Sequence, residues 1–339
     1  MSKIIRIGID IAKHIFYIHG CDMNGKTCLR KKLQRKDLMT FFAQQPPCLV
    51  AMESCSGSHF WGRQLRSLGH DVRLITPQFV VPYRKSQKND YNDAEAICDA
   101  AGRDNMRFVA VKSEEQQAAL MVHRIREQCV AERTSLSNQI RGHLHEFGFV
   151  VPQGTTKIRE QVPCIIAQDD FPALARLLLQ DLLDAMDILE KRIKTLEQQI
   201  QQLNKNSDVA NRLMSIKGVG PITASAMVAT VGDPRLFKNS RQFAAWLGLV
   251  PKQFSSGGKT KLGGITKRGD SYLRKLLIQG ARAVMYKAST STDARSQWIH
   301  QLRSRKPDNV VATALAAKLA RTIWAMMING DSYHEFAVS

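Results

Sequence analysis

The chain has 339 residues, 44% of them apolar, so it is long enough for two or more globular domains and too apolar for an intrinsically disordered protein. Its 49 Lys and Arg residues against 30 Asp and Glu give a net charge of +19, which favours a polyanionic partner; a basic surface kept for solubility is the alternative. The seven Cys residues contain no C-x-x-C pair, and no apolar run reaches the roughly 18 residues that span a bilayer. We therefore expect a cytoplasmic protein without a membrane partner, structural zinc or a disulfide framework.

The first hundred residues carry the pattern of an α/β domain. In chain order we predict strands over 4–11, 15–20 and 27–33, a helix over 36–44, a strand over 48–54, a helix over 59–69 and a strand over 71–77. Asn24-Gly25 is a hairpin signal between the second and third strands. A further helix over 91–103 has Asp90 or Asn92 near its cap position. Three strands followed by helix, strand, helix and strand predict a mixed sheet.

The middle of the chain is predicted to be two long helices. A polar helix over 112–147 leads to a connector over 150–165, which contains Pro152, Gly154 and Pro163, and a second helix covers 171–204. The second helix has a heptad seam formed by Leu182, Met186, Leu189, Ile193, Leu196, Ile200 and Leu203. An antiparallel partner within the chain, such as 115–147, and a second protomer are equally good partners for this seam.

The last third is predicted to be mostly helical, with helices near 221–230, 240–247, 270–288 and 308–329. Asp270 is placed to cap the third of these helices. Val311, Leu315, Leu319 and Ile323 give the fourth an apolar side that predicts packing. The whole pattern divides the chain into 1–110, 111–207 and 208–339.

Four carboxylates stand at positions that suggest a metal site. Asp10 lies inside the first apolar strand, where an unpaired charge costs several kcal/mol. Glu53 ends another apolar strand, and Asp90 and Asp93 share a face if their helix begins at residue 90. Four acids brought together repel one another and need cations, and two Mg²⁺ ions roughly 4 Å apart would suit a phosphodiester substrate.

Each of these acids also has a structural interpretation. Asp10 could be a turn or edge residue, Glu53 could cap a helix, and Asp90 and Asp93 could complement a helix dipole. The joint layout of the four is that of RNase H-like nucleases. The GIDIAK segment also has a likeness to the first phosphate loop of sugar kinases, but the glycines of a phosphate loop are missing after it.

Residues 213–226 (LMSIKGVGPITASA) predict a helix-hairpin-helix element. Lys217, Gly218 and Gly220 precede a helix start near Pro221, where backbone N–H groups could hold a nucleic-acid phosphate. An ordinary glycine turn between packed helices is the alternative.

A basic loop follows in the segment 246–277. Between 252 and 282 a single acid, Asp270, stands among eight basic residues: Lys252, Lys259, Lys261, Lys267, Arg268, Arg274, Lys275 and Arg282. These cations could hold phosphates, and Ser255 or Ser256 could act as a covalent nucleophile beside Gly257 and Gly258. A flexible Ser-Ser-Gly-Gly loop is the structural alternative.

Taken together, GIDIAK, MES, KNDYNDAEAICDAA, IKGVGPITA and LGLVPKQFSSGGKTKLGGITKRGD resemble the DEDD transposases of bacterial insertion sequences. This family includes the Piv-type invertases and the bridge-RNA-guided recombinases. The resemblance covers residues 5 to 285 and preserves the order of the motifs. It implies a RuvC-like (RNase H fold) N-terminal domain, a coiled-coil insertion and a C-terminal transposase domain.

The resemblance also implies roles for individual residues. It makes Asp10, Glu53, Asp90 and Asp93 the metal-binding tetrad and places a serine nucleophile in the SSGG motif, in a composite site with a tetrad from another subunit. Ser256 is our choice for that nucleophile. DNA, a structured guide RNA and a homo-oligomer, dimer or tetramer, are the implied partners.

We therefore expect Mg²⁺-dependent transposition or site-specific recombination through a phosphoserine link. A RuvC-like nuclease that hydrolyses junctions with water is the first alternative and needs no serine. A nucleic-acid-binding protein without chemistry is the second.

Overall fold

The computed structural model describes residues 3–85, 89–291, 293–331 and 333. The chain forms two compact units. Unit 1 consists of Met1–Gln117 with Ala229–Phe243, and unit 2 consists of Ala118–Val228 with Ala244–Ser339. Helix α5 is continuous from one unit into the other.

Unit 1 is built on a six-stranded mixed sheet with the order β3-β2-β1-β4-β5-β6. Its strands are β1 (Arg6–Ile11), β2 (Ile15–Cys21), β3 (Thr27–Gln34), β4 (Leu49–Glu53), β5 (Asp71–Ile75) and β6 (Phe108–Val109). Strand β1 pairs antiparallel with β2 and parallel with β4, and β4 pairs parallel with β5. The mixed α/β sheet predicted from the sequence is thus confirmed, and β6 is an addition that the prediction missed.

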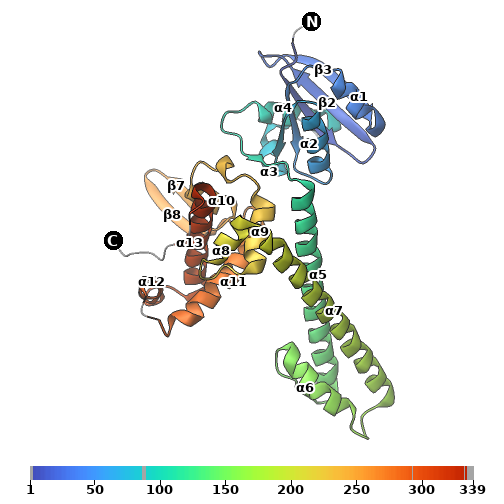
Figure 1. The fold of residues 1–339 in the computed structure, drawn as a ribbon, viewed down its shortest axis with the longest axis vertical. Helices are drawn as coiled ribbons and strands as arrows, with labels where there is room; N and C mark the ends of the chain where they lie inside the picture. Colours follow the sequence, from blue (N-terminus) through green and yellow to red (C-terminus); the bar gives the residue numbers. More distant parts are fainter. Residues whose placement is uncertain (1–2, 86–88, 292, 332, 334–339) are drawn as a thin grey trace. The chain divides into compact units, whose positions relative to one another are not determined.

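Helices cover both faces of this sheet (Figure 1). The helical elements of unit 1 are η1 (Arg35–Asp37), α1 (Leu38–Ala43), α2 (Ser58–Ser67), α3 (Pro77–Val80), η2 (Val81–Tyr83), α4 (Asp90–Ala101) and η3 (Pro234–Leu236). Apolar side chains of β1 and β2, such as Ile9 and Phe16, are buried with Leu38 and Leu65 against α1 and α2. We call this side of the sheet the α2 face. The other side, the α4 face, is covered by α4, whose Ala96 and Ile97 are buried beside Ala51.

Two helices of 33 residues, α5 (Glu114–Glu146) and α7 (Ala173–Lys205), run antiparallel. Arg126 contacts Glu197, and further along Ser137 contacts Met186. The heptad seam packs on α5, since Ile193 and Leu196 are buried with Cys129. The sequence left open whether the seam packs on a helix of the same chain or on a second protomer. Helix α5 of the same chain covers most of the seam, although Leu203 is 40% exposed.

The connector expected over 150–165 is wrong, because α6 (Thr155–Ile166) occupies most of it. Pro163 lies inside this helix, in its last turn, and its presence argued against a helix. Ile158, Val162 and Ile166 recur at helical spacing and are buried against α5 and α7.

The rest of unit 2 is mostly helical, as predicted. The elements of this region are α8 (Asp208–Met214), α9 (Pro221–Val231), α10 (Ser240–Trp246), β7 (Pro251–Ser256), β8 (Lys259–Ile265), α11 (Ser271–Ala288), α12 (Ala294–Arg303) and α13 (Asp308–Asn329). Of these, α9 and α10 each have residues in both units. Asp270 caps α11 by accepting a hydrogen bond from the backbone N–H of Leu273, as expected. The sequence prediction missed α8, α12 and the β7–β8 hairpin.

Helix α13 is the one described helix long and apolar enough to cross a bilayer. Its apolar side is nevertheless buried inside unit 2, where Val311, Leu315, Leu319 and Ile323 are at most 2% exposed. The packing predicted for these residues is confirmed, and α13 is a core helix of the unit.

Candidate active site

Strands β1 and β4 place Asp10 and Glu53 side by side. The parallel register pairs Ile9 with Met52, so the next residue of each strand is Asp10 and Glu53. Alternate residues of a strand point to opposite faces, and Gly8 and Ala51, two residues earlier, lie on the α4 face. Both carboxylates are therefore placed on the α4 face at the carboxyl ends of neighbouring parallel strands.

Helix α4 brings Asp90 and Asp93 to the same place. The side chain of Asn89 accepts a hydrogen bond from the backbone N–H of Tyr91 and caps the helix, so α4 begins at Asp90. The sequence predicted a cap near Asp90 or Asn92, but the cap residue is Asn89. With the helix starting at residue 90, Asp90 and Asp93 are one turn apart on one side of it.

Gly8 allows this helix to approach the sheet closely. A Cβ atom added at Gly8 would lie 2.3 Å from the carbonyl oxygen of Ala94 and 2.5 Å from the backbone nitrogen of Cys98. Any side chain at this position would therefore push α4 away from β1. Gly8 thus sets the distance between Asp10 on the strand and Asp93 on the helix.

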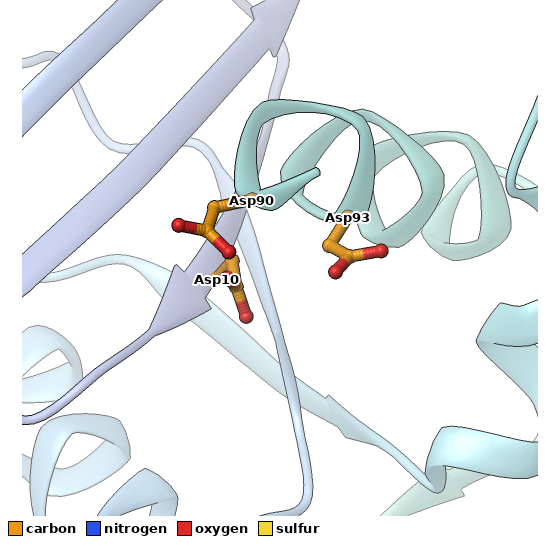
Figure 2. Close-up of side chains that lie close together, drawn as sticks. All are labelled: Asp10, Asp90 and Asp93. Atoms are coloured by element: carbon orange, nitrogen blue, oxygen red, sulfur yellow. The ribbon is translucent and has the colours of Figure 1, made fainter. Parts of the chain in front are cut away.

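The three aspartates form a compact group (Figure 2). One carboxylate oxygen of each of Asp10, Asp90 and Asp93 lies within 4.8 Å of the others. Asp93 is buried, Asp10 is half-buried and Asp90 is exposed, so the group opens to solvent on one side. Glu53 is not one of the three, but its charge acts on Asp10.

Burial, together with the negative charges of Asp93, Asp90 and Glu53, raises the pKa of Asp10 to about 6. Arg84 relieves part of this repulsion, because its Nε lies 2.5 Å from a carboxylate oxygen of Asp93. Only about a quarter of the Arg84 side chain is exposed. The sequence reasoning missed Arg84, although it lies in a basic stretch directly before the D-x-x-D pair.

This donor set fits a hard divalent cation. It offers carboxylate oxygens alone, the ligands that Mg²⁺ prefers, and like charges kept so close are stabilised by a cation between them. Glu53 stands near enough to act electrostatically on the same group.

Ser256 lies in unit 2, at the end of a β-hairpin. The loop expected within the basic segment 246–277 is wrong in this respect, because β7 and β8 pair antiparallel with Ser256 opposite Lys259. Gly257 and Gly258 form the two-residue turn with φ values of 54° and 77°, and a two-glycine loop between strands is a hairpin signal that the sequence reasoning did not use.

The hairpin places the two candidate serines on opposite faces. Residues directly opposite in an antiparallel pair share a face, so Ser256 lies with Lys259, and Phe254 with Lys261. Ser255 lies on the other face, where its hydroxyl donates to Thr260 Oγ1 at 3.4 Å and accepts from Gln253 at 2.8 Å. Ser256 therefore has two lysines on its face, and Ser255 has polar neighbours on the other.

The remaining predicted nucleic-acid residues have varied surroundings. Lys252, Lys259 and Lys261 are exposed along the hairpin. Lys267 has a left-handed φ of 54°, and the carbonyl of the next residue, Arg268, accepts from Arg274 at 3.4 Å. This segment is therefore held at the base of the hairpin.

The other three residues predicted to bind nucleic acid lie in the turn before α9. Lys217 forms an ion pair with Asp293 at 3.5 Å. Gly218 has a φ of 96°, and a Cβ added there would lie 3.0 Å from the carbonyl of Gly280 in α11. Gly218 thus serves close packing of the turn on a helix, while a Cβ at Gly220 would meet nothing within 4 Å.

Two family models match the chain. A transposase model of the DEDD, IS110 type matches residues 7–149, and one described as "Transposase IS116/IS110/IS902 family" matches residues 210–297. The first range contains all four carboxylates, and the second contains the hairpin.

Relatives match the chain over almost its full length. A protein of Pseudomonas aeruginosa described as a "Probable family 20 transposase" is 50% identical over 97% of this chain and 98% of its own. The transposase for insertion sequence element IS1328 of Yersinia enterocolitica is 42% identical over 98% and 99%. The transposase for IS1111A of Coxiella burnetii is 39% identical over 98% and 92%. The chain therefore belongs to the IS116/IS110/IS902 family of transposases, enzymes that cleave and transfer DNA strands.

Proposed function

We propose that the protein moves an insertion sequence by Mg²⁺-dependent strand cleavage and rejoining through a serine nucleophile. The observation that carries this proposal is the convergence of Asp10, Asp90 and Asp93 within 4.8 Å, with the charge of Glu53 acting on Asp10. The family uses divalent metal ions in general. Two Mg²⁺ ions held by the four carboxylates would polarise the scissile phosphate.

Ser256 is the nucleophile in this proposal. Its Oγ forms a bond to phosphorus, the bond from phosphorus to the 3′ oxygen breaks, and the serine proton ends on that oxygen. The products are a phosphoserine link and a free 3′ hydroxyl, so the bond energy is kept for rejoining without ATP. Lys259 and Lys261 support Ser256 over Ser255, because they share its face and can hold the phosphate.

The finer assignments of fold and partners belong to the same proposal. Unit 1 would have an RNase H-like (RuvC-like) fold, α5 with α7 a coiled-coil insertion, and α8 with α9 a helix-hairpin-helix element. Domain limits at 1–110, 111–207 and 208–339 remain our proposal. So do the DNA contacts of the turn and hairpin residues Lys217, Gly218, Gly220, Lys252, Lys259, Lys261, Lys267 and Arg268.

A structured guide RNA and a dimer or tetramer are the proposed partners, and the cytoplasm is the proposed location. The net charge of +19 is consistent with binding two nucleic acids at once.

The test is a cleavage assay on labelled junction DNA with Mg²⁺, run on denaturing gels with and without protease. The protein is purified from cells that carry its flanking DNA, so that a bound RNA is retained and can be identified. We expect a protein–DNA adduct that is lost in Ser256→Ala and in Asp10→Asn and kept in Ser255→Ala. Cleavage without an adduct, unchanged in Ser256→Ala, would instead identify a hydrolytic nuclease.

A further inference from the structure

A row of aromatic and cationic side chains extends from the acid cluster to the edge of the sheet. The antiparallel register places Tyr17 of β2 opposite Asp10, and Lys32 of β3 opposite Tyr17. Opposite residues share a face, so these positions lie on the α4 face, together with Arg30 two residues before Lys32. We call Tyr17, Tyr91, Arg30 and Lys32 the ledge.

The two tyrosines fix the positions of the two cations. The rings of Tyr17 and Tyr91 meet edge to face with centroids 4.7 Å apart. The guanidinium carbon of Arg30 lies 4.6 Å from the centroid of the Tyr91 ring, and Nζ of Lys32 lies 5.8 Å from that of Tyr17. Cation–π contacts of this kind hold a positive charge without neutralising it.

Both cations remain available to an anion. Arg30 and Lys32 are exposed, and within the described part of the chain neither has a carboxylate oxygen within the 4.0 Å of an ion pair. Glu95, on the next turn of α4, acts on Arg30 by its charge, but its carboxylate bonds to Lys85 at 2.6 Å. Two unneutralised cations therefore lie beside a cluster of acids.

We propose that the ledge binds the phosphate backbone of the DNA strand that is cleaved at the acid cluster. Neighbouring strands are about 4.8 Å apart, so the backbone of Lys32 is roughly 10 Å from that of Asp10. A strand whose scissile phosphate lies at Asp10 and which crosses β2 toward β3 brings its next phosphates over Arg30 and Lys32. This inference rests on the proposed function, because it takes the acid cluster as the place of cleavage.

Edge strands also carry lysines that only prevent aggregation. Lys31 separates the two interpretations. It lies on the same edge strand and is also exposed, but it belongs to the α2 face, where its Nζ lies 5.0 Å from the centroid of the Phe41 ring. Removal of Lys31 therefore takes away one positive charge, as removal of Arg30 or of Lys32 alone does, but from the α2 face.

The experiment measures the binding of labelled junction DNA to the full-length protein, purified with any bound RNA, without metal and over a range of NaCl concentrations. Each phosphate contact contributes about 0.9 to the slope of log Kd against log salt. We expect Arg30→Ala with Lys32→Ala to reduce this slope by about 1 to 2 and to weaken binding about tenfold or more. Lys31→Ala should change neither the slope nor, beyond about twofold, the affinity, and Arg30→Lys with Lys32→Arg should restore the slope.

A second arm locates the contact. Methylphosphonates replace single phosphates on either side of the cleavage position. We expect one or two neutral linkages next to the scissile phosphate to weaken binding by the wild type and to have no further effect in the Arg30→Ala, Lys32→Ala variant. An equal loss in Lys31→Ala, or no responsive linkage near the cleavage position, would overturn the proposal. So would a loss of RNA binding with DNA binding unchanged.

The cleavage assay distinguishes failure of this inference from failure of the proposed function. If wild-type protein forms its adduct but the ledge variant binds DNA with an unchanged slope, the ledge proposal alone is wrong. If no metal-dependent cleavage occurs at all, the proposed function is wrong, whatever the ledge binds. Melting temperatures of the variants, measured in parallel, show that each one is folded.

Discussion

Asp10 is a carboxylate in a buried strand, and burial together with three nearby acids raises its pKa to about 6 from 3.8. Between about pH 4 and 6 the folded metal-free protein therefore binds more protons than the unfolded chain. It follows that the stability of the metal-free protein falls as the pH rises through this window. A divalent cation requires the ionised carboxylate, so the rise in Tm caused by Mg²⁺ should be full near pH 7.5 and shrink as the pH falls below about 6.

Thermal unfolding with and without Mg²⁺ across this pH range checks this prediction. Asp10→Asn should remove the pH-dependent part of the Mg²⁺ effect. Asp71→Asn, an exposed carboxylate paired with Arg73 elsewhere on the sheet, should leave it in place. A Mg²⁺ effect of the same size at about pH 5 and pH 8 would show that the titration of Asp10 is not linked to metal binding.

Arg84 supplies positive charge to the acid cluster in the absence of metal. Replacing it in Arg84→Gln leaves the buried carboxylate of Asp93 without this partner, which should lower the stability of the metal-free protein by about 1 to 3 kcal/mol. A bound cation would replace the lost charge, so Mg²⁺ should raise the Tm of this variant more than that of the wild type. Urea unfolding with and without Mg²⁺ measures both effects.

Lys85→Gln is the matched control for Arg84. Its side chain is 67% exposed and pairs with Glu95 and Asp99, so its loss should change stability by less than about 1 kcal/mol. If Mg²⁺ stabilised Arg84→Gln less than the wild type, Arg84 would instead be part of the metal-bound site.

At the scale of elements, the close contact of α4 with β1 decides whether the acids meet. Gly8→Ala would place a methyl group against the backbone of Ala94 and Cys98, so α4 must shift as a whole. We expect a loss of about 1 to 3 kcal/mol in stability and a much larger loss of Mg²⁺ affinity and strand cleavage. Calorimetric titration with Mg²⁺ and urea unfolding separate the two effects.

Gly20→Ala is the comparison within the same sheet. Its nearest neighbours are side-chain atoms of Leu29 and Ile4 at 3.0 Å or more, which need to shift by only a few tenths of an ångström and do not belong to α4, so metal affinity should be nearly unchanged. Equal loss of metal affinity in both variants would mean that the spacing of α4 is not the reason for the loss.

The elements that the sequence predicted well are those with one strong local signal. The strand of Asp10 and that of Glu53 are runs of buried apolar residues, and the start of α4 follows from its first-turn acids and from an Asn cap one residue away from the expected position. Helix α6 was missed because Pro163 indicated a break, although this proline is exposed and the opposite side of the helix is buried against α5 and α7. The hairpin was missed because its glycines indicated flexibility as well as a turn.

The candidate site was predictable in part for the same reason. Asp10 and Glu53 belong to apolar strands, and Asp90 and Asp93 belong to the first turn of a helix, and the sequence marks each of these elements. Arg84 and the ledge were not predictable, because they depend on the register of β1, β2 and β3 and on which face each residue occupies. A shift of the register by one residue would have moved Lys31 to the α4 face in place of Lys32.

At the scale of the whole molecule, the proposed chemistry is divided between the two units, with the carboxylates in unit 1 and Ser256 in unit 2. If the site is composite between subunits, a protomer with a defective serine and one with a defective tetrad can together form a complete site. We expect Ser256→Ala and Asp10→Asn proteins, each inactive alone, to regain part of the wild-type adduct formation when they are co-expressed.

The identity of the chain that is linked to DNA in such a mixture tests the composite site, because only the protomer with an intact Ser256 can be linked to DNA. With the two variants distinguished by a size tag, the labelled DNA should attach to the Asp10→Asn chain alone. The doubly substituted Ser256→Ala, Asp10→Asn chain, mixed with Asp10→Asn, provides the control and should give no adduct. If the mixture of single variants stays inactive although the chains associate, the carboxylates and the serine must act within one chain, and the composite site would be excluded.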